Sequence, residues 1–159
     1  MDDGPVFRPA GQADLPALLD LYQHLNPGDA RPDASAAGAV LDRLAALPGS
    51  AILVAQVGQA LAASCTLVVV PNLTRGGRPF GLIENVVTHA DFRRRGLGRQ
   101  LLDLACAAGW DAGCYKIMLM TGSTRPGTLK FYRDAGFEAS KTGFQKRRIA
   151  ARSEDSDSA

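Results

Sequence analysis

The sequence predicts a mixed α/β fold of the α+β class, with one central mixed sheet that carries helices on both faces. Three observations predict it. The stretch Leu82 to Thr121 reads as strand, helix and strand, so its two strands should lie parallel in one sheet. Two apolar, β-rich runs, Ala51 to Val57 and Leu61 to Val70, flank Gly58-Gln59 and predict a hairpin. Amphipathic helical patterns lie before and after this hairpin.

The first fifty residues predict a short strand and two helices. The strand is expected at Val6 to Arg8. Asp14 is placed to cap a helix over Leu15 to Leu25, because a carboxylate can accept from the unpaired N–H groups of a first turn. A second helix is expected from about Ala34 to Leu47, where a Pro-Gly pair ends it.

Beyond the hairpin, a loop from Pro71 to Gly81 leads into the strand Leu82 to Val87. A glycine turn then opens a helix to about Ala112, and the apolar strand Tyr115 to Thr121 follows, as suits the centre of a sheet. The last expected elements are a short helix at Thr128 to Ala135, one or two strands in Phe137 to Ala139 and Thr142 to Arg148, and a disordered polar tail over 149–159. Residues 1–148 are thus expected to form a single domain.

Composition excludes several classes of protein. A hydrophobic content of 46% and a charged content of 21% are ordinary for a globular chain, and a net charge of +2 does not indicate a nucleic-acid or membrane-surface protein. Cys65, Cys106 and Cys114 lack C-x-x-C spacing, which predicts free thiols rather than disulfides or zinc. His24 and His89 have no partner at ligand spacing, so neither a metal nor a His triad is expected. With no signal peptide or apolar span, we expect a cytoplasmic protein.

The run Arg93 to Gly98 follows a strand and opens a helix. Glycines let the backbone approach a ligand, the first helical N–H groups are unpaired, and the helix dipole favours an anion there. These features predict a phosphate-binding loop, whereas the hexapeptide alone would favour a solvated basic turn. Nucleic-acid binding accounts for the arginines less well, because no aromatic platform or DNA-binding motif accompanies them.

This arrangement resembles the GNAT superfamily of acetyl-CoA-dependent N-acyltransferases. The motif of that family is Arg or Gln, two residues, Gly, one residue, then Gly or Ala, and Arg93 to Gly98 matches it. Other features of the family accompany this motif over about residues 5 to 148. They are the strand Ile83 to Val87, the Leu-rich helix, and the short motifs Phe131-Tyr132 and Gly136-Phe137. The resemblance implies a mostly antiparallel sheet with a β-α-β coenzyme-binding unit.

The resemblance also implies where coenzyme A binds. Loop N–H groups and the nearby arginines would hold its phosphates, and the main chain of one strand would pair with the pantetheine amides and polarise the thioester carbonyl. Arg125 stands where the family often has an Asn that contacts pantetheine, so Thr121, Ser123 and Thr128 are candidates to replace it. The coenzyme-binding candidates are Val86, Val87, Thr88, Arg93, Arg94, Arg95, Gly96, Leu97, Gly98, Arg99, Gln100, Thr121 and Ser123.

Two side chains are candidates for the chemistry. Glu84 is the one acid in an apolar strand, and it would serve as a general base for an amine, directly or through water. The alternative is a carboxylate that faces solvent or pairs with an arginine. Tyr132 matches the Tyr of the family's Phe-Tyr, which protonates the leaving thiolate; the alternative is an aromatic core residue.

Together these features predict an N-acetyltransferase that moves an acetyl group from acetyl-CoA to a primary amine of a small molecule or peptide. Direct attack in a ternary complex is expected, since no activated Cys is evident. The first two helices and the loop Pro71 to Gly81 would wall the acceptor, and Arg75 and Arg78 indicate an anionic group on it. A non-catalytic acyl-CoA-binding or sensor domain of the same fold is the alternative. No metal, nucleic acid or membrane partner is expected, and monomer and homodimer are both open.

Overall fold

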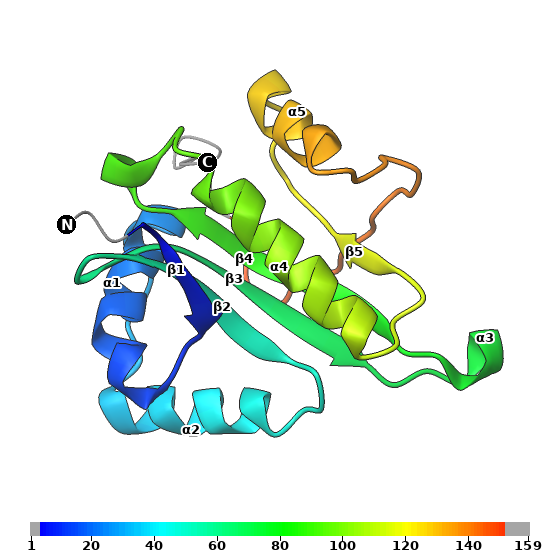
Figure 1. Ribbon diagram of the computed structural model, residues 1–159, viewed down its shortest axis with the longest axis horizontal. Coiled ribbons are helices and arrows are strands. Elements are labelled where there is room, and N and C mark those ends of the chain that lie inside the picture. Colours follow the sequence, from blue (N-terminus) through cyan, green and yellow to red (C-terminus); the bar gives the residue numbers. More distant parts are fainter. Residues whose placement is uncertain (1–3, 152–159) are drawn as a thin grey trace.

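The computed structural model describes residues 4–151 and builds them around one central sheet with helices on both faces (Figure 1). Neighbouring strands run antiparallel from β1 to β4, while β4 and β5 run parallel. Within the described residues the order is β1-β2-β3-β4-β5, formed by Val6–Pro9, Ala51–Val57, Ala60–Val70, Phe80–Thr88 and Ile117–Leu119. The predicted hairpin, the β-α-β unit and the mostly antiparallel mixed sheet are confirmed.

Different sets of helices cover the two faces of this sheet. On one face, α1 (Leu15–Leu25) packs on β3 and β4, and α2 (Ala34–Ala45) packs on β2. On the other face, α4 (Leu97–Asp111) lies across β2, β3 and β4 (Figure 1). The short helix α5 (Pro126–Asp134) adds aromatic side chains to the core on the α4 side. None of the helices within residues 4–151 is long and apolar enough to cross a membrane.

The central strands contribute side chains to the core on both faces of the sheet, because successive side chains of a strand point to opposite faces. Val54 packs with Leu18 and Leu21 of α1. Its neighbours in the chain, Leu53 and Ala55, pack instead with the leucines of α4. The near-continuous apolar runs in the sequence therefore mark strands that are buried on both sides.

Asp14 stands at the N-cap position of α1, as predicted, but its side chain makes no capping hydrogen bond to the first turn of the helix. Its carboxylate accepts from the N–H of Gly11 at 2.7 Å and from both terminal nitrogens of Arg8 at 2.7 and 2.8 Å. A charge-assisted bidentate pair is stronger than a cap, and it lowers the pKa of the Asp14 carboxyl. Asp33 does act as a cap, since it accepts from the N–H of Ala36 at the start of α2.

The end of the chain also departs from the prediction. The strand β5 covers Ile117–Leu119 rather than Tyr115 to Thr121, and the described residues after α5 form no strand. The strands expected in Phe137 to Ala139 and Thr142 to Arg148 are therefore absent from the described chain. Because β-propensity acts only where a neighbouring edge accepts the strand, the apolar pattern alone did not suffice; Phe144 is left 93% exposed. Most of the predicted disordered tail, 152–159, lies outside the described residues.

Candidate active site

The strand β4 loses one of its two neighbours halfway along its length. Its parallel ladder with β5 joins Gly81 to Ile117, Leu82 to Met118 and Ile83 to Leu119, and β5 then ends. Figure 1 shows the chain leaving the sheet after β5 toward α5, away from the line of β4. Pairing of β4 with β3 continues as far as Thr88. The stretch from Glu84 to Thr88 therefore has no strand on its second edge within the described chain, and an extended ligand can pair with such an edge.

A β-bulge lies at the same place. Ser64 and Thr66 of β3 pair with Val87 and Glu84 of β4, so one residue of β3 faces two residues of β4. One of those two, Asn85, has a φ of 53°, in the left-handed region that Asn tolerates better than most residues. The bulge thus interrupts regular pairing at the point where β5 ends.

Glu84 is exposed at this bulge, so the argument that a buried carboxylate must be working does not hold for it. Its side chain lies on the α1 face, because Glu84 pairs with Thr66 and paired residues point to the same side of a sheet. Within the described residues it forms no ion pair, so the alternative of an arginine partner is not found there. An exposed carboxylate beside an open strand edge remains accessible to an incoming amine.

Tyr132 reaches the same region from α5. Its ring is half-buried and packs edge-to-face on Phe131, with centroids 5.1 Å apart, and on Phe137 at 6.5 Å. Burial raises the pKa of the phenol, and the negative charge of Glu84 acts in the same direction. A raised pKa keeps the hydroxyl protonated at neutral pH, which is the state that a proton donor requires. The fold thus brings Tyr132 within electrostatic reach of Glu84, 48 positions away in the sequence.

The glycine loop follows the open half of β4. Gly96 has a φ of 75° at the start of α4, and a Cβ built on it would meet only the side-chain nitrogen of Gln100, at 3.8 Å, so space beside the loop is open. Gly98 serves close packing instead, because a Cβ there would lie 3.3 Å from the ring of Phe131 and 3.4 Å from the hydroxyl of Thr88. The N–H of Gln100 makes a helical bond to Gly96, so the N–H groups before it are those available to an anion. Leu97 is buried, and only its main chain can face a ligand.

The four arginines around the loop have different surroundings. Arg93 donates through Nε to the carbonyl of Thr88 at 3.4 Å. Arg94 is exposed, with its backbone in the left-handed region at a φ of 59°. Arg95 lies over the ring of Phe92. Arg99 donates to the carbonyl of Asp134 and pairs with Asp103, so it joins α4 to α5.

Thr121 and Ser123 lie in the loop before α5, where each hydroxyl accepts a backbone N–H two residues ahead. The N–H of Ser123 donates to Thr121 at 3.1 Å, and the N–H of Arg125 donates to Ser123 at 3.3 Å. These hydrogen bonds shape the turn that leads into α5. Both hydroxyls can still donate to a ligand, since an accepting hydroxyl keeps its own proton.

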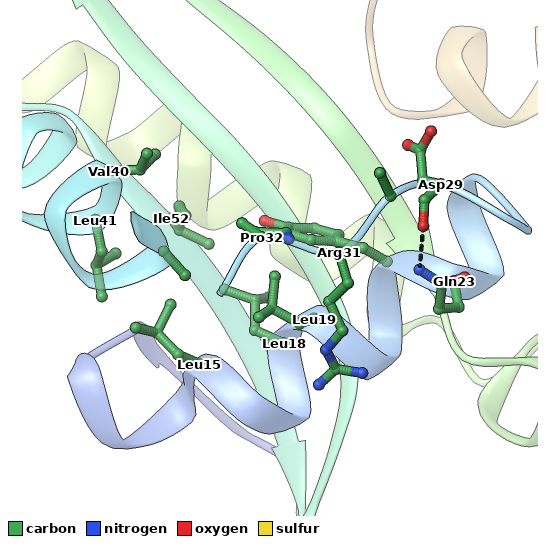
Figure 2. A pocket seen from close by; sticks show the side chains of 13 residues that line it. Leu15, Leu18, Leu19, Gln23, Asp29, Arg31, Pro32, Val40, Leu41 and Ile52 are labelled. Carbon is green, nitrogen blue, oxygen red and sulfur yellow. Dashed lines mark hydrogen bonds between the residues drawn. The ribbon is translucent and has the colours of Figure 1, made fainter. Parts of the chain in front are cut away.

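A pocket of about 250 Å³ lies between α1 and α2 (Figure 2). Figure 2 shows side chains of both helices and of the loop between them converging on it. Arg31 of that loop pairs with Asp20 of α1. The cavity is lined by Leu15, Leu18, Leu19, Tyr22, Gln23, Asp29, Ala30, Arg31, Pro32, Ala37, Val40, Leu41 and Ile52.

The loop that carries Arg75 lies elsewhere, at the beginning of β4 (Figure 1), and the Arg75 guanidinium lies over the ring of Tyr115, 5.5 Å from its centroid. Four residues of strand, roughly 13 Å, separate that end of β4 from Glu84.

The fold also joins two residues that the sequence analysis had considered apart. The rings of His24 and His89 are in contact, with centroids 4.0 Å apart and planes tilted by 44°, although 65 positions separate them. No spacing rule signals such a contact.

Within the described residues no group of three His, Cys, Asp or Glu side chains is placed to hold a metal ion. The cysteines are free thiols, and burial raises the pKa of Cys65 to about 12, which keeps it from acting as a thiolate nucleophile.

The chain belongs to the acetyltransferase (GNAT) family, whose model matches residues 15–137. That range includes the open half of β4, the glycine loop and Tyr132. The resemblance to this family of acetyl-CoA-dependent acyltransferases is therefore confirmed.

Individual relatives agree with this assignment. A putative acetyltransferase from Agrobacterium tumefaciens str. C58 has a similar structure, with a TM-score of 0.84 and 47% identity over 90% of this chain and 99% of that one. Glucosamine 6-phosphate N-acetyltransferase of Trypanosoma brucei brucei is 40% identical over 76 residues, which are 48% of this chain and 50% of that protein. A probable glucosamine 6-phosphate N-acetyltransferase of Oryza sativa subsp. japonica is 36% identical over 77 residues, 48% of this chain and 44% of that protein. The chain thus matches about half the length of these curated relatives.

Proposed function

We propose that the protein is an N-acetyltransferase that transfers an acetyl group from acetyl-CoA to a primary amine of a small molecule or peptide by direct attack in a ternary complex. The observation that carries this proposal is the break in the sheet at Glu84. An open strand edge and a bulge lie there, with an exposed carboxylate on the α1 face and a protonated phenol on the α4 side, and the same strand leads into the glycine loop. Each part supplies one requirement of acyl transfer from a coenzyme A thioester.

The coenzyme would lie along the open half of β4. Main-chain groups from Val86 to Thr88 would pair with the pantetheine amides, as an added strand does. The N–H groups of Leu97 to Arg99 would receive the pyrophosphate, with Arg93, Arg94 and Arg95 nearby. The open space beside Gly96 fits an anion at that point. The turn formed by Thr121 and Ser123 would face the pantetheine from the α5 side.

The chain's own groups would then carry the proton transfers. Glu84 accepts a proton from the attacking amine, directly or through a water molecule. A main-chain N–H near Val86 or Val87 donates to the thioester oxygen as negative charge develops on it. As the new C–N bond forms and the C–S bond breaks, the Tyr132 hydroxyl donates its proton to the departing sulfur. The raised pKa of Cys65 supports direct transfer to the amine over a covalent acyl-enzyme.

The acceptor that we propose to test first is a phosphorylated amino sugar. Two curated relatives are named for glucosamine 6-phosphate, an amine of small size that also carries an anionic group. The cavity between α1 and α2 and the pairing of Arg31 with Asp20 lie on the face where Glu84 points. Peptide amines and unphosphorylated sugars complete the panel.

Release of free thiol from acetyl-CoA, measured with and without each amine, tests this function. Amine-dependent release, with an acetylated amine found by mass spectrometry, is the expected result. Tight binding of acetyl-CoA without turnover on any amine would favour the alternative of a sensor domain. Thiol release that leaves an acetylated protein before any amine is added would contradict direct attack.

A further inference from the structure

A continuous stack of side chains links the end of α1 to the glycine loop. His24 lies in the last turn of α1, and its ring packs on that of His89, which follows β4, with centroids 4.0 Å apart and the ring planes tilted by 44°. His89 in turn packs edge-to-face on Phe92 at 5.6 Å. The guanidinium of Arg95 lies over the other end of this set, 5.1 Å from the ring of Phe92. We call these four residues the His24–Arg95 stack.

Hydrogen bonds to the main chain of Asp91 fix the middle of this stack. The N–H of Asp91 donates to Nδ1 of His89 at 3.2 Å, and Arg95 donates to the Asp91 carbonyl at 3.1 Å. An accepting Nδ1 places the proton of a neutral His89 on Nε2. One peptide segment therefore holds both the imidazole and the guanidinium in place.

Arg95 needs such support, because its own backbone supplies little. Arg94 before it and Gly96 after it both have left-handed φ values, 59° and 75°, so no regular secondary structure holds this turn. A free arginine side chain loses rotamer entropy when a ligand fixes it. A guanidinium already fixed on an aromatic ring has given up much of that entropy before the ligand arrives.

We propose that His24, from the helix on the opposite face of the sheet, is a positioning residue for coenzyme A: through His89 and Phe92 it fixes Arg95 beside the pyrophosphate. This inference rests on the proposed function, since it assumes that the glycine loop receives the coenzyme. His24 itself touches neither the coenzyme nor the reacting atoms. Its contribution appears as affinity for the phosphate-bearing part of the coenzyme.

Coenzyme A binding to the full chain, measured by calorimetry, tests the proposal. His24→Ala removes the ring that packs on His89. Binding of coenzyme A should weaken roughly three- to fivefold, as expected for the loss of one of the contacts that hold the Arg95 guanidinium in place. His24→Phe, which keeps a flat ring on His89, should bind as the wild type does. The loss should be the same for 3′-dephospho-coenzyme A, because the pyrophosphate is the group concerned. A loss confined to coenzyme A would overturn this assignment in favour of the 3′-phosphate.

A double variant separates positioning from general damage to the fold. If His24 acts through Arg95, then His24→Ala combined with Arg95→Ala should bind no more weakly than Arg95→Ala alone. Additive losses, or an unchanged affinity in His24→Ala, would overturn the inference while the coenzyme site itself stands. A wild-type chain that fails to bind coenzyme A would instead refute the proposed function, and this inference with it.

Discussion

The two halves of β4 are built differently. From Gly81 to Ile83 the strand is paired on both edges, and Ile83 is 1% exposed among the leucines of α4. From Glu84 to Thr88 it has β3 on one edge only, contains the bulge, and exposes Glu84 and Asn85. One strand thus provides scaffold in its first half and accessible main chain in its second.

The contrast shows how a sheet can present backbone groups to a ligand without losing its shape. A row of unpaired N–H and C=O groups is a liability in a strand that is free along its whole length. In this chain the same strand is secured by two neighbours before the open half begins, and β3 continues beside it. Sites supported by rigid elements hold their geometry better than sites on loops. We therefore expect stability to depend on the first half and catalysis on the second.

The largest effect is expected from Ile83→Ala in the paired half. Removal of a fully buried Ile side chain should lower the free energy of unfolding by about 2–5 kcal/mol, because Ile83 packs among core leucines. The turnover number of the protein that remains folded should be nearly unchanged. Chemical denaturation and active-site-normalised kinetics measure the two quantities. A large fall in kcat with normal stability would contradict the division of roles.

In the open half, Tyr132→Phe should lower kcat by about a hundredfold or more, while affinity for coenzyme A stays close to that of the wild type. The matched control is Tyr115→Phe, which removes the same hydroxyl near the beginning of β4 and should leave kcat unchanged. Unaltered activity of Tyr132→Phe would show that another group protonates the sulfur.

The pH dependence of the wild-type rate gives a second check on Tyr132. Burial raises the pKa of this phenol above its ordinary value of about 10. Since the donor is active in its protonated form, its contribution should persist through neutral pH and be lost only as pH rises past that raised pKa. A loss of kcat already between about pH 7 and 9, in a chain that remains folded, would argue against the phenol as the proton donor.

An intermediate effect is expected at the bulge itself. Asn85→Val places a β-branched residue at a φ of 53°, which costs roughly 1–2 kcal/mol, and relief of that strain would disturb the open edge. Asn85→Gly accepts the same backbone and should retain activity. Thermal unfolding and kcat/KM for both variants measure the effect. Equal behaviour of the two would mean that the left-handed conformation is not important to the site.

The smallest effect is expected from Gly98→Ala. The new methyl group would lie 3.4 Å from Thr88, an ordinary contact, but 3.3 Å from Phe131, so that ring must move by a few tenths of an ångström. We expect KM for acetyl-CoA to rise by roughly two- to fivefold, as for a misplaced binding group worth under 1 kcal/mol, with kcat little changed. Gly4→Ala, at a glycine before β1 with open space around it, provides the control.

Structural elements that depend only on a short stretch of sequence were predictable. The hairpin around Gly58, the β-α-β unit and the helix that starts after Gly96 all follow from local patterns, and the structure contains them. Asp14 shows how a local rule fails, because a partner from another segment, Arg8, competes for its carboxylate. The terminal strands failed for a similar reason, since a strand needs an edge that accepts it.

The parts of the site that depend on contacts between residues far apart in the sequence could not be predicted from the sequence. Nothing in the sequence marks Asn85 as the residue that turns left-handed in a bulge, because Asn is compatible with many conformations. The stacking of His24 on His89 joins α1 to the end of β4 and follows from packing alone. Glu84 and Tyr132 were identified as types of residue in a family pattern, but their proximity is a property of the fold.

The most direct test of the central claim is a crystal structure of the chain with coenzyme A bound. We expect the pantetheine amides to pair with the main chain of Val86 to Thr88 and the pyrophosphate to accept from the N–H groups of Leu97 to Arg99. We also expect the thiol to lie between Glu84 and Tyr132. A coenzyme bound elsewhere, with the open half of β4 facing solvent, would contradict this expectation.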